Sequence, residues 1–102
     1  MTRFDALHHL IAENPHDAEL RYLLGLEHVS RGDLEQALLC FDACLERNAD
    51  YAYAYFHASR ALQELGRMDD ARAMALRGLA AARRARDARA ASELEELVDE
   101  LG

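Results

Sequence analysis

Residues 18–51 read AELRYLLGLEHVSRGDLEQALLCFDACLERNADY, and residues 52–85 continue with AYAYFHASRALQELGRMDDARAMALRGLAAARRA. A shift of 34 positions, from residue 18 to residue 52, keeps the apolar and turn positions of the two segments in phase. A repeat of this length indicates a helical unit that buries its apolar face only by stacking on a neighbour. The identical pairs are Ala18 with Ala52, Gly32 with Gly66, Ala37 with Ala71, and Leu45 with Leu79.

Each segment has the pattern of two amphipathic helices joined by a tight turn. Apolar side chains recur at three- and four-residue steps over residues 18–30, and a second such stripe covers residues 34–48. Between them, Gly32 supplies a helix stop and Asp33 a helix start. Gly66 and Asp69 occupy the corresponding turn of the second segment. We therefore expect an antiparallel helix pair in each segment.

The composition favours helices in one compact module of 102 residues. The chain has one proline and five glycines, and it is 51% hydrophobic and 30% charged, which is an ordinary globular balance. No stretch approaches the roughly 18 to 20 apolar residues that span a bilayer. We therefore expect no export signal and no membrane anchor, and we place the protein in the cytoplasm.

Charge is distributed unevenly along the chain, whose net charge is −7. Residues 1–51 carry 4 arginines and 10 acidic residues, residues 52–91 carry 8 and 4, and residues 92–102 carry no arginine and 5 acidic residues. A solvated helical surface with acidic neighbours accounts for the central basic block. The acidic total argues against a nucleic-acid-binding surface. RNA binding stays a minor alternative on a set of scattered arginines, namely Arg77, Arg83, Arg84, Arg86 and Arg89.

On these residues the chain resembles the tetratricopeptide-repeat family, in the manner of a small bacterial-type member. Leu24-Gly25 matches the leucine–glycine pair of the family's first helix, and Ala37 and Phe41 match the signature of its second helix. Small residues at these places let helices cross closely. Further matches are Gly32, Cys44, Tyr55, Ser59, Gly66, Ala71 and Gly78. Departures from the family pattern are Arg21, His28 and Ala75.

The resemblance implies an all-α, right-handed solenoid of antiparallel helix pairs with about six helices in a single domain, 1–102. We expect an opening half repeat at 1–14, repeats at 18–51 and 52–85, and a capping helix at 87–101 whose apolar stripe faces the last repeat. Thr2 and Asp5 form a plausible helix-starting box. No glycine or proline lies between Arg84 and Asp87. We expect a helix break there, and a helix that continues through these residues is the alternative.

The resemblance also implies a binding groove on the concave side, lined by the first helix of each repeat. Aromatic and arginine side chains dominate binding energy at interfaces, and the expected lining contains both. It lacks the lysine and asparagine set that chaperone-adaptor members use to clamp a terminal carboxylate, so binding of chaperone tails is not expected. Leu26 and Val29 could instead be packing residues. The expected peptide-binding residues are Glu19, Tyr22, Leu26, Val29, Ser30, Tyr53, Phe56, His57, Arg60 and Gln63.

Catalytic and metal-binding patterns are missing from the sequence. His8 and His9 are adjacent and therefore point about 100° apart on a helix, and no histidine has a partner at the four-residue spacing of a zinc helix. Cys40 and Cys44 read as small apolar side chains in a reducing compartment. We expect no enzyme activity, no cofactor and no metal.

Two functions from different classes follow from this interpretation. The first is an adaptor that captures a segment of an unidentified protein or peptide partner in the groove, with Arg60 pairing a carboxylate of the partner. The second is a structural subunit that self-associates as a homo-oligomer or docks in a larger assembly. A third hypothesis has the acidic final helix fold over the basic block and occlude the groove. Neither nucleic acid nor membrane is an expected partner.

Overall fold

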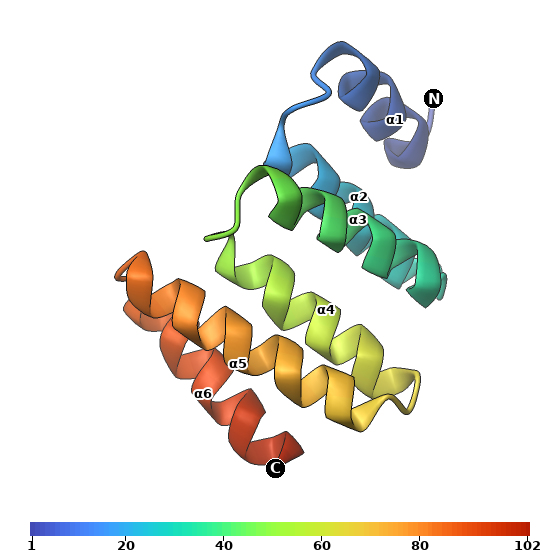
Figure 1. The fold of residues 1–102 in the computed structure, drawn as a ribbon. Helices are drawn as coiled ribbons and strands as arrows, with labels where there is room; N and C mark the ends of the chain where they lie inside the picture. Colours follow the sequence, from blue (N-terminus) through green and yellow to red (C-terminus); the bar gives the residue numbers. More distant parts are fainter.

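The computed structural model describes all residues, 1–102, as six α-helices joined by short loops, with no strand (Figure 1). The helices follow one another down the molecule in chain order, so that the first and last helices lie at opposite ends. Their bounds are α1 (Arg3–Glu13), α2 (Ala18–Ser30), α3 (Leu34–Arg47), α4 (Ala52–Glu64), α5 (Met68–Arg84) and α6 (Ala88–Leu101).

Polar side chains satisfy free backbone N–H groups at three helix starts. The Thr2 hydroxyl accepts from the Asp5 N–H at 3.1 Å while the Asp5 carboxylate accepts from the Thr2 N–H at 3.2 Å, which confirms the predicted box. Asp17 caps α2 by accepting from the Leu20 N–H, and Asp87 caps α6 by accepting from the Ala90 N–H.

Three of the turns use the same backbone device to end a helix. Gly32 and Gly66 have φ of 79°, and Arg86, which has a side chain, has φ of 56°. At each site the next N–H reaches back five residues, as from Asp87 N to Ala82 O at 2.9 Å, which forms a Schellman motif. The expected break between Arg84 and Asp87 is therefore present, and it needs no glycine because Arg86 itself takes the left-handed conformation.

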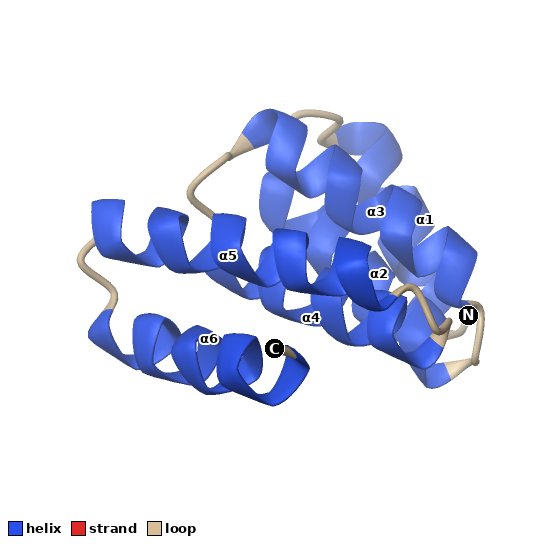
Figure 2. Cartoon of the chain, turned by 60° about the horizontal axis from the view of Figure 1, so that its bottom comes forward, coloured by secondary structure: helices blue, strands red, loops and turns tan.

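The contacts between helices show which side of the stack is concave. The backbone of α2 comes close to that of α4, and the backbone of α4 to that of α6, whereas the backbones of α1, α3 and α5 do not come close to one another. The stack therefore bends toward the side of α2, α4 and α6, which we call the inner face. Figure 2 shows α6 lying alongside α4 and α5 at the end of the stack far from α1.

Small residues allow the helices to pack closely. Phe41 of α3 is fully buried against Gly25 of α2, where an added Cβ would come within 2.5 Å of the ring. Gly78 of α5 lies in the same way against Tyr55 and Leu94, which belong to the helices on either side. Adding a side chain at either glycine should lower the free energy of unfolding, because protein cores are packed as densely as organic crystals.

The opening helix is attached to α2 through aromatic contacts. Phe4 lies edge-on to His28 with ring centroids 5.1 Å apart, and the Arg31 guanidinium stands 4.1 Å from the Phe4 centroid. The loop after α1 is held by Arg47, whose Nε donates to the Pro15 carbonyl at 2.8 Å. No helix of the protein is both long enough and apolar enough to cross a membrane.

Candidate functional site on the inner face

An aromatic cluster joins α2 to α4 at the centre of the inner face. Tyr22 and His57 have ring centroids 5.7 Å apart, His57 and Phe56 are 5.3 Å apart, and Phe56 and Tyr53 are 6.4 Å apart. Tyr51, just before α4, lies 4.9 Å from Tyr22. The structure therefore brings together the four aromatic residues expected in the groove and adds a fifth. We call these five residues the aromatic cluster.

Each ring of this cluster is half-buried, so part of its surface stays open to a ligand. Tyr22 and Tyr51 rest on the buried core around Phe41, and Tyr53 and Phe56 rest on the core around Leu94. The cluster is therefore a rigid surface rather than a set of free side chains. Aromatic rings held in this way contribute contact area at little conformational cost.

Burial also changes the protonation of the cluster. It lowers the pKa of His57 below its ordinary value, because loss of solvent penalises the imidazolium, and nearby Arg60 adds to this lowering while Glu93 opposes it. Burial is the main cause that raises the pKa of Tyr51 to about 12, with the Glu19 carboxylate second. At neutral pH the cluster therefore presents uncharged rings.

Three of the expected groove residues of α2 lie apart from the aromatic cluster, and two of these three have a packing role. Leu26 and Val29 are half-buried against the core that contains Ala37 and Phe41, so they help to hold α2 on α3 and α4. Ser30, the last residue of α2, is exposed. Glu19, exposed in the first turn of the helix, acts electrostatically on the Tyr51 hydroxyl.

Arg60 and Gln63, two polar residues of the inner face, are already hydrogen-bonded to another part of the same chain. Arg60 Nη1 donates to Glu100 Oε2 at 2.5 Å, and Gln63 Nε2 donates to the same oxygen at 3.3 Å. These hydrogen bonds lower the pKa of the Glu100 carboxyl. The carboxylate expected from a partner at Arg60 is thus supplied by α6 of the same chain.

Tyr51, Glu93 and Glu100 belong to the inner face and were not predicted. Glu93 lies beside Tyr53, and it raises the pKa of that hydroxyl after the larger effect of burial. The seven-residue interval from Glu93 to Glu100 puts them on one side of a helix, which is a signal present in the sequence.

The basic block of residues 52–91 is largely paired with carboxylates. Arg67, in the turn before α5, contacts Glu35 of α3 at 2.6 Å. Three of the five arginines behind the RNA alternative have acidic neighbours within 4 Å. These pairs are Arg83 with Glu95, Arg84 with Asp50, and Arg89 with Glu93.

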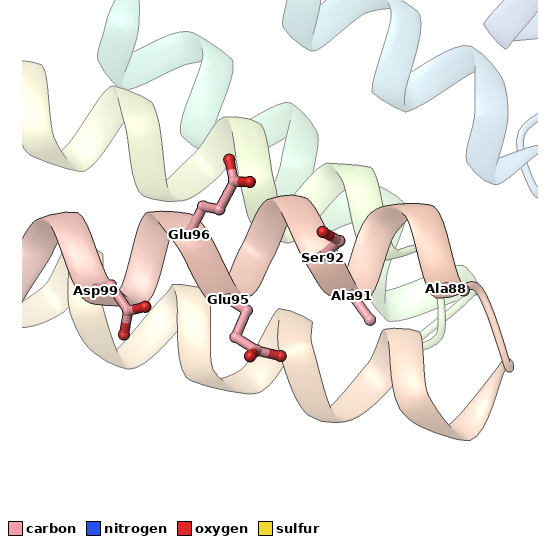
Figure 3. Close-up of a pocket in the computed structure, with 6 residues that line it drawn as sticks. All are labelled: Ala88, Ala91, Ser92, Glu95, Glu96 and Asp99. Carbon is pink, nitrogen blue, oxygen red and sulfur yellow. The ribbon is translucent and has the colours of Figure 1, made fainter.

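One exposed face of α6 forms a shallow pocket of small and acidic side chains (Figure 3). Figure 3 shows Glu96 projecting from one side of the helix while Glu95 and Asp99 project from the other. The remaining lining residues are Ala88, Ala91 and Ser92. This surface belongs to the end of the stack and lies apart from the aromatic cluster. No group of three or more His, Cys, Asp or Glu side chains in the protein is arranged to hold a metal ion.

Comparison with known proteins places this architecture in a family. Residues 18–51 match the family model of the tetratricopeptide repeat. An uncharacterized protein of Methanocaldococcus jannaschii is 43% identical over 68 residues, which are 67% of this chain and 79% of that protein. A tetratricopeptide repeat domain protein from Salinibacter ruber is 30% identical, with a TM-score of 0.79 over 85% of this chain and 88% of that one.

A more distant structure shares the fold. The Yersinia enterocolitica type III secretion chaperone SycD, in complex with a peptide of the translocator YopD, has a TM-score of 0.77 at 15% identity. The superposition covers 97% of this chain and 79% of that one. The six stacked helices, the turns at Gly32 and Gly66 and these matches together lead to one conclusion: the chain belongs to the tetratricopeptide repeat family.

Proposed function

We propose that this protein is a non-catalytic adaptor that binds a segment of a partner protein on its inner face. The observation that carries this proposal is the aromatic cluster, which runs continuously from Tyr22 on α2 to Tyr53 on α4. Half-exposed aromatic side chains on a rigid support are the residues that dominate binding energy at protein interfaces. A partner segment laid across them would bury rings that now face water.

The comparisons support this proposal at the level of the fold. SycD, which shares the arrangement of helices, was solved with a bound peptide.

We further propose that the chain consists of an opening half repeat (1–14), repeats at 18–51 and 52–85, and a capping helix (87–101). We place its action in the cytoplasm, where the free thiols of Cys40 and Cys44 would persist.

The test uses peptides selected from a phage-displayed library on the intact protein, followed by mapping of the bound peptide with amide NMR shifts. We expect shifts at Tyr22, Tyr53, Phe56 and His57. Tyr53→Ala combined with Phe56→Ala should weaken binding at least about tenfold, because two hot-spot rings are lost. Leu39→Ala is the control, since Leu39 is 62% exposed on α3, outside the inner face. Unchanged binding in the double variant would refute the groove.

Self-association stays a second candidate, and one observation favours it. A hollow between α3, α4 and α5 on the outer side has four apolar lining residues, Leu38, Leu39, Leu62 and Met74, together with three charged ones, Glu35, Asp42 and Arg67. A second copy could cover this hollow. Sedimentation equilibrium should then show a dimer that Leu39→Arg dissociates. A protein that is monomeric at high concentration would exclude this candidate.

A further inference from the structure

The inner face has little free positive charge. Arg60, the one cation among the expected groove residues, already bonds Glu100, and its neighbour Gln63 bonds the same oxygen. His57 is held in its neutral form at pH 7 by burial, as its lowered pKa indicates. An acidic partner segment would therefore have to displace an internal carboxylate before it gained a cation.

The carboxylates Glu19 and Glu93 on the same surface have few basic partners within the chain. Glu19 has no basic group within 4 Å, and it stands close enough to Tyr51 to raise the pKa of its hydroxyl after burial. At the other end of the cluster, Glu93 lies beside Tyr53 and His57. Its basic neighbour Arg89 is 3.6 Å away and has a side chain that is 85% exposed. Such an exposed pair contributes little and opens easily.

Carboxylates therefore flank a surface of electron-rich rings. Tyrosine and phenylalanine faces attract cations through the ring quadrupole, and arginine stacks on them through its planar guanidinium. The protein itself uses this contact within the cluster, where Arg60 lies 5.5 Å from the Phe56 centroid, and again away from the inner face, where Arg77 lies 5.4 Å from the Tyr55 centroid. The chemistry that completes the surface is a cation on the partner.

Resting on the function proposed above, we propose that the inner face selects a basic partner segment. One or more arginine side chains of that segment lie over the aromatic cluster, with Glu19 and Glu93 as their counter-charges. Arginine is favoured over lysine because its planar group both stacks on a ring and donates two hydrogen bonds to a carboxylate. This deepens the proposed function by naming the charge and side-chain type of the ligand.

The test compares three short peptides of one sequence, blocked at both ends, that carry arginine, its neutral isostere citrulline, or glutamate at the same positions. Binding is measured by NMR titration of the full chain. Two double variants have equal net charge. Glu19→Gln with Glu93→Gln removes the two proposed counter-charges, whereas Glu46→Gln with Glu95→Gln removes two carboxylates from other surfaces, where Glu46 is 78% and Glu95 61% exposed.

We expect the arginine peptide to bind about tenfold more tightly than the citrulline peptide, with the glutamate peptide weakest. Shifts should centre on Tyr22, Tyr53 and His57. The Glu19/Glu93 double variant should lose about tenfold in affinity for the arginine peptide only, while the Glu46/Glu95 variant keeps it. Because the two double variants have the same net charge, a difference in affinity between them shows a local site rather than a general attraction of the basic peptide to an acidic protein.

Three results would overturn this inference while leaving the groove in place. The first is citrulline or glutamate peptide binding on the inner face as tightly as arginine peptide. The second is equal weakening by both double variants. The third is the absence of shifts with all three peptides when a phage-selected peptide still binds the cluster. If neither the designed nor the selected peptides reach the cluster, the proposed function fails as well.

Discussion

Arg60 on α4 and Glu100 on α6 are joined by a hydrogen-bonded ion pair of 2.5 Å between residues 40 positions apart. Both side chains are about half-exposed, so the pair adds little to stability. Its main effect is on the inner face. Arg60 is the only arginine among the expected groove residues, and it already donates a hydrogen bond to a carboxylate of the same chain. Glu100 of the acidic final helix therefore pairs with one residue of the expected groove, while occlusion of the groove by that helix stays a prediction.

Glu100→Gln should free Arg60 and raise the affinity for the glutamate peptide by a few fold, because a partner carboxylate no longer competes with an internal one. Isothermal titration calorimetry would measure the change. Asp99→Asn is the matched control, since it removes the same charge from the exposed neighbouring position, which points about 100° away from Glu100 around α6. Equal gains in the two variants would show that only net charge matters.

Acid should destabilise the protein partly through His57. Its pKa is lowered in the folded state, so between that pKa and the ordinary value of 6.5 the unfolded chain binds more protons. Stability from this group is present above 6.5 and is lost as the pH falls through this window. Urea midpoints at pH 7.5 and 5.5 would show the loss, and His57→Gln should reduce it. An imidazole that titrates at or above 6.5 by NMR would contradict this expectation.

Arg86→Gly should stabilise the fold by about 0.5 to 1 kcal/mol. A side chain in the left-handed region costs roughly 1 to 2 kcal/mol, and the greater unfolded-state entropy of glycine offsets part of the gain. Gly66→Ala at the equivalent turn position should destabilise the protein by about 1 kcal/mol. Both are measured by urea unfolding followed by circular dichroism. A loss of stability in Arg86→Gly would show that the Arg86 side chain makes a contribution larger than this strain.

Ser59→Ala should cost about 0.5 to 1.5 kcal/mol of unfolding free energy, because the fully buried hydroxyl donates to the Ala71 carbonyl at 2.7 Å. This bond ties α4 to α5. Ser30→Ala is the control, since Ser30 is exposed at the end of α2, and it should change stability by less than about 0.5 kcal/mol. Similar losses in the two variants would refute a role for the buried bond.

The helices and the aromatic surface could be predicted because their signals are local or periodic. The stripe over residues 18–30 coincides with α2, since the capping Asp17 and the turn glycine Gly32 mark its two ends. The 34-residue period placed Tyr22 and Phe56 at equivalent positions, and equivalent positions on successive first helices face the same side of the stack. For that reason the expected aromatic residues lie next to one another in the structure.

The role of the last helix could not be predicted by the same means. Helix α4 begins at Ala52 and α6 begins at Ala88, which is 36 residues later rather than 34. Transfer of positions by the repeat period therefore points to the wrong residues, and Glu93 and Glu100 were missed. Tyr51 was missed because it lies before α4, outside the helical pattern. The pairing of Arg60 depends on tertiary packing of side chains far apart in sequence.

The acidic exposed face of α6 has a consequence for what can stack on it. A further helix stacked on this face would cover Glu95, Glu96 and Asp99, of which only Glu95 has a basic neighbour within 4 Å, Arg83 at 3.5 Å. A helix or partner that stacks on this face must therefore supply basic side chains of its own for Glu96 and Asp99, so the acidic face limits which surfaces can continue the stack.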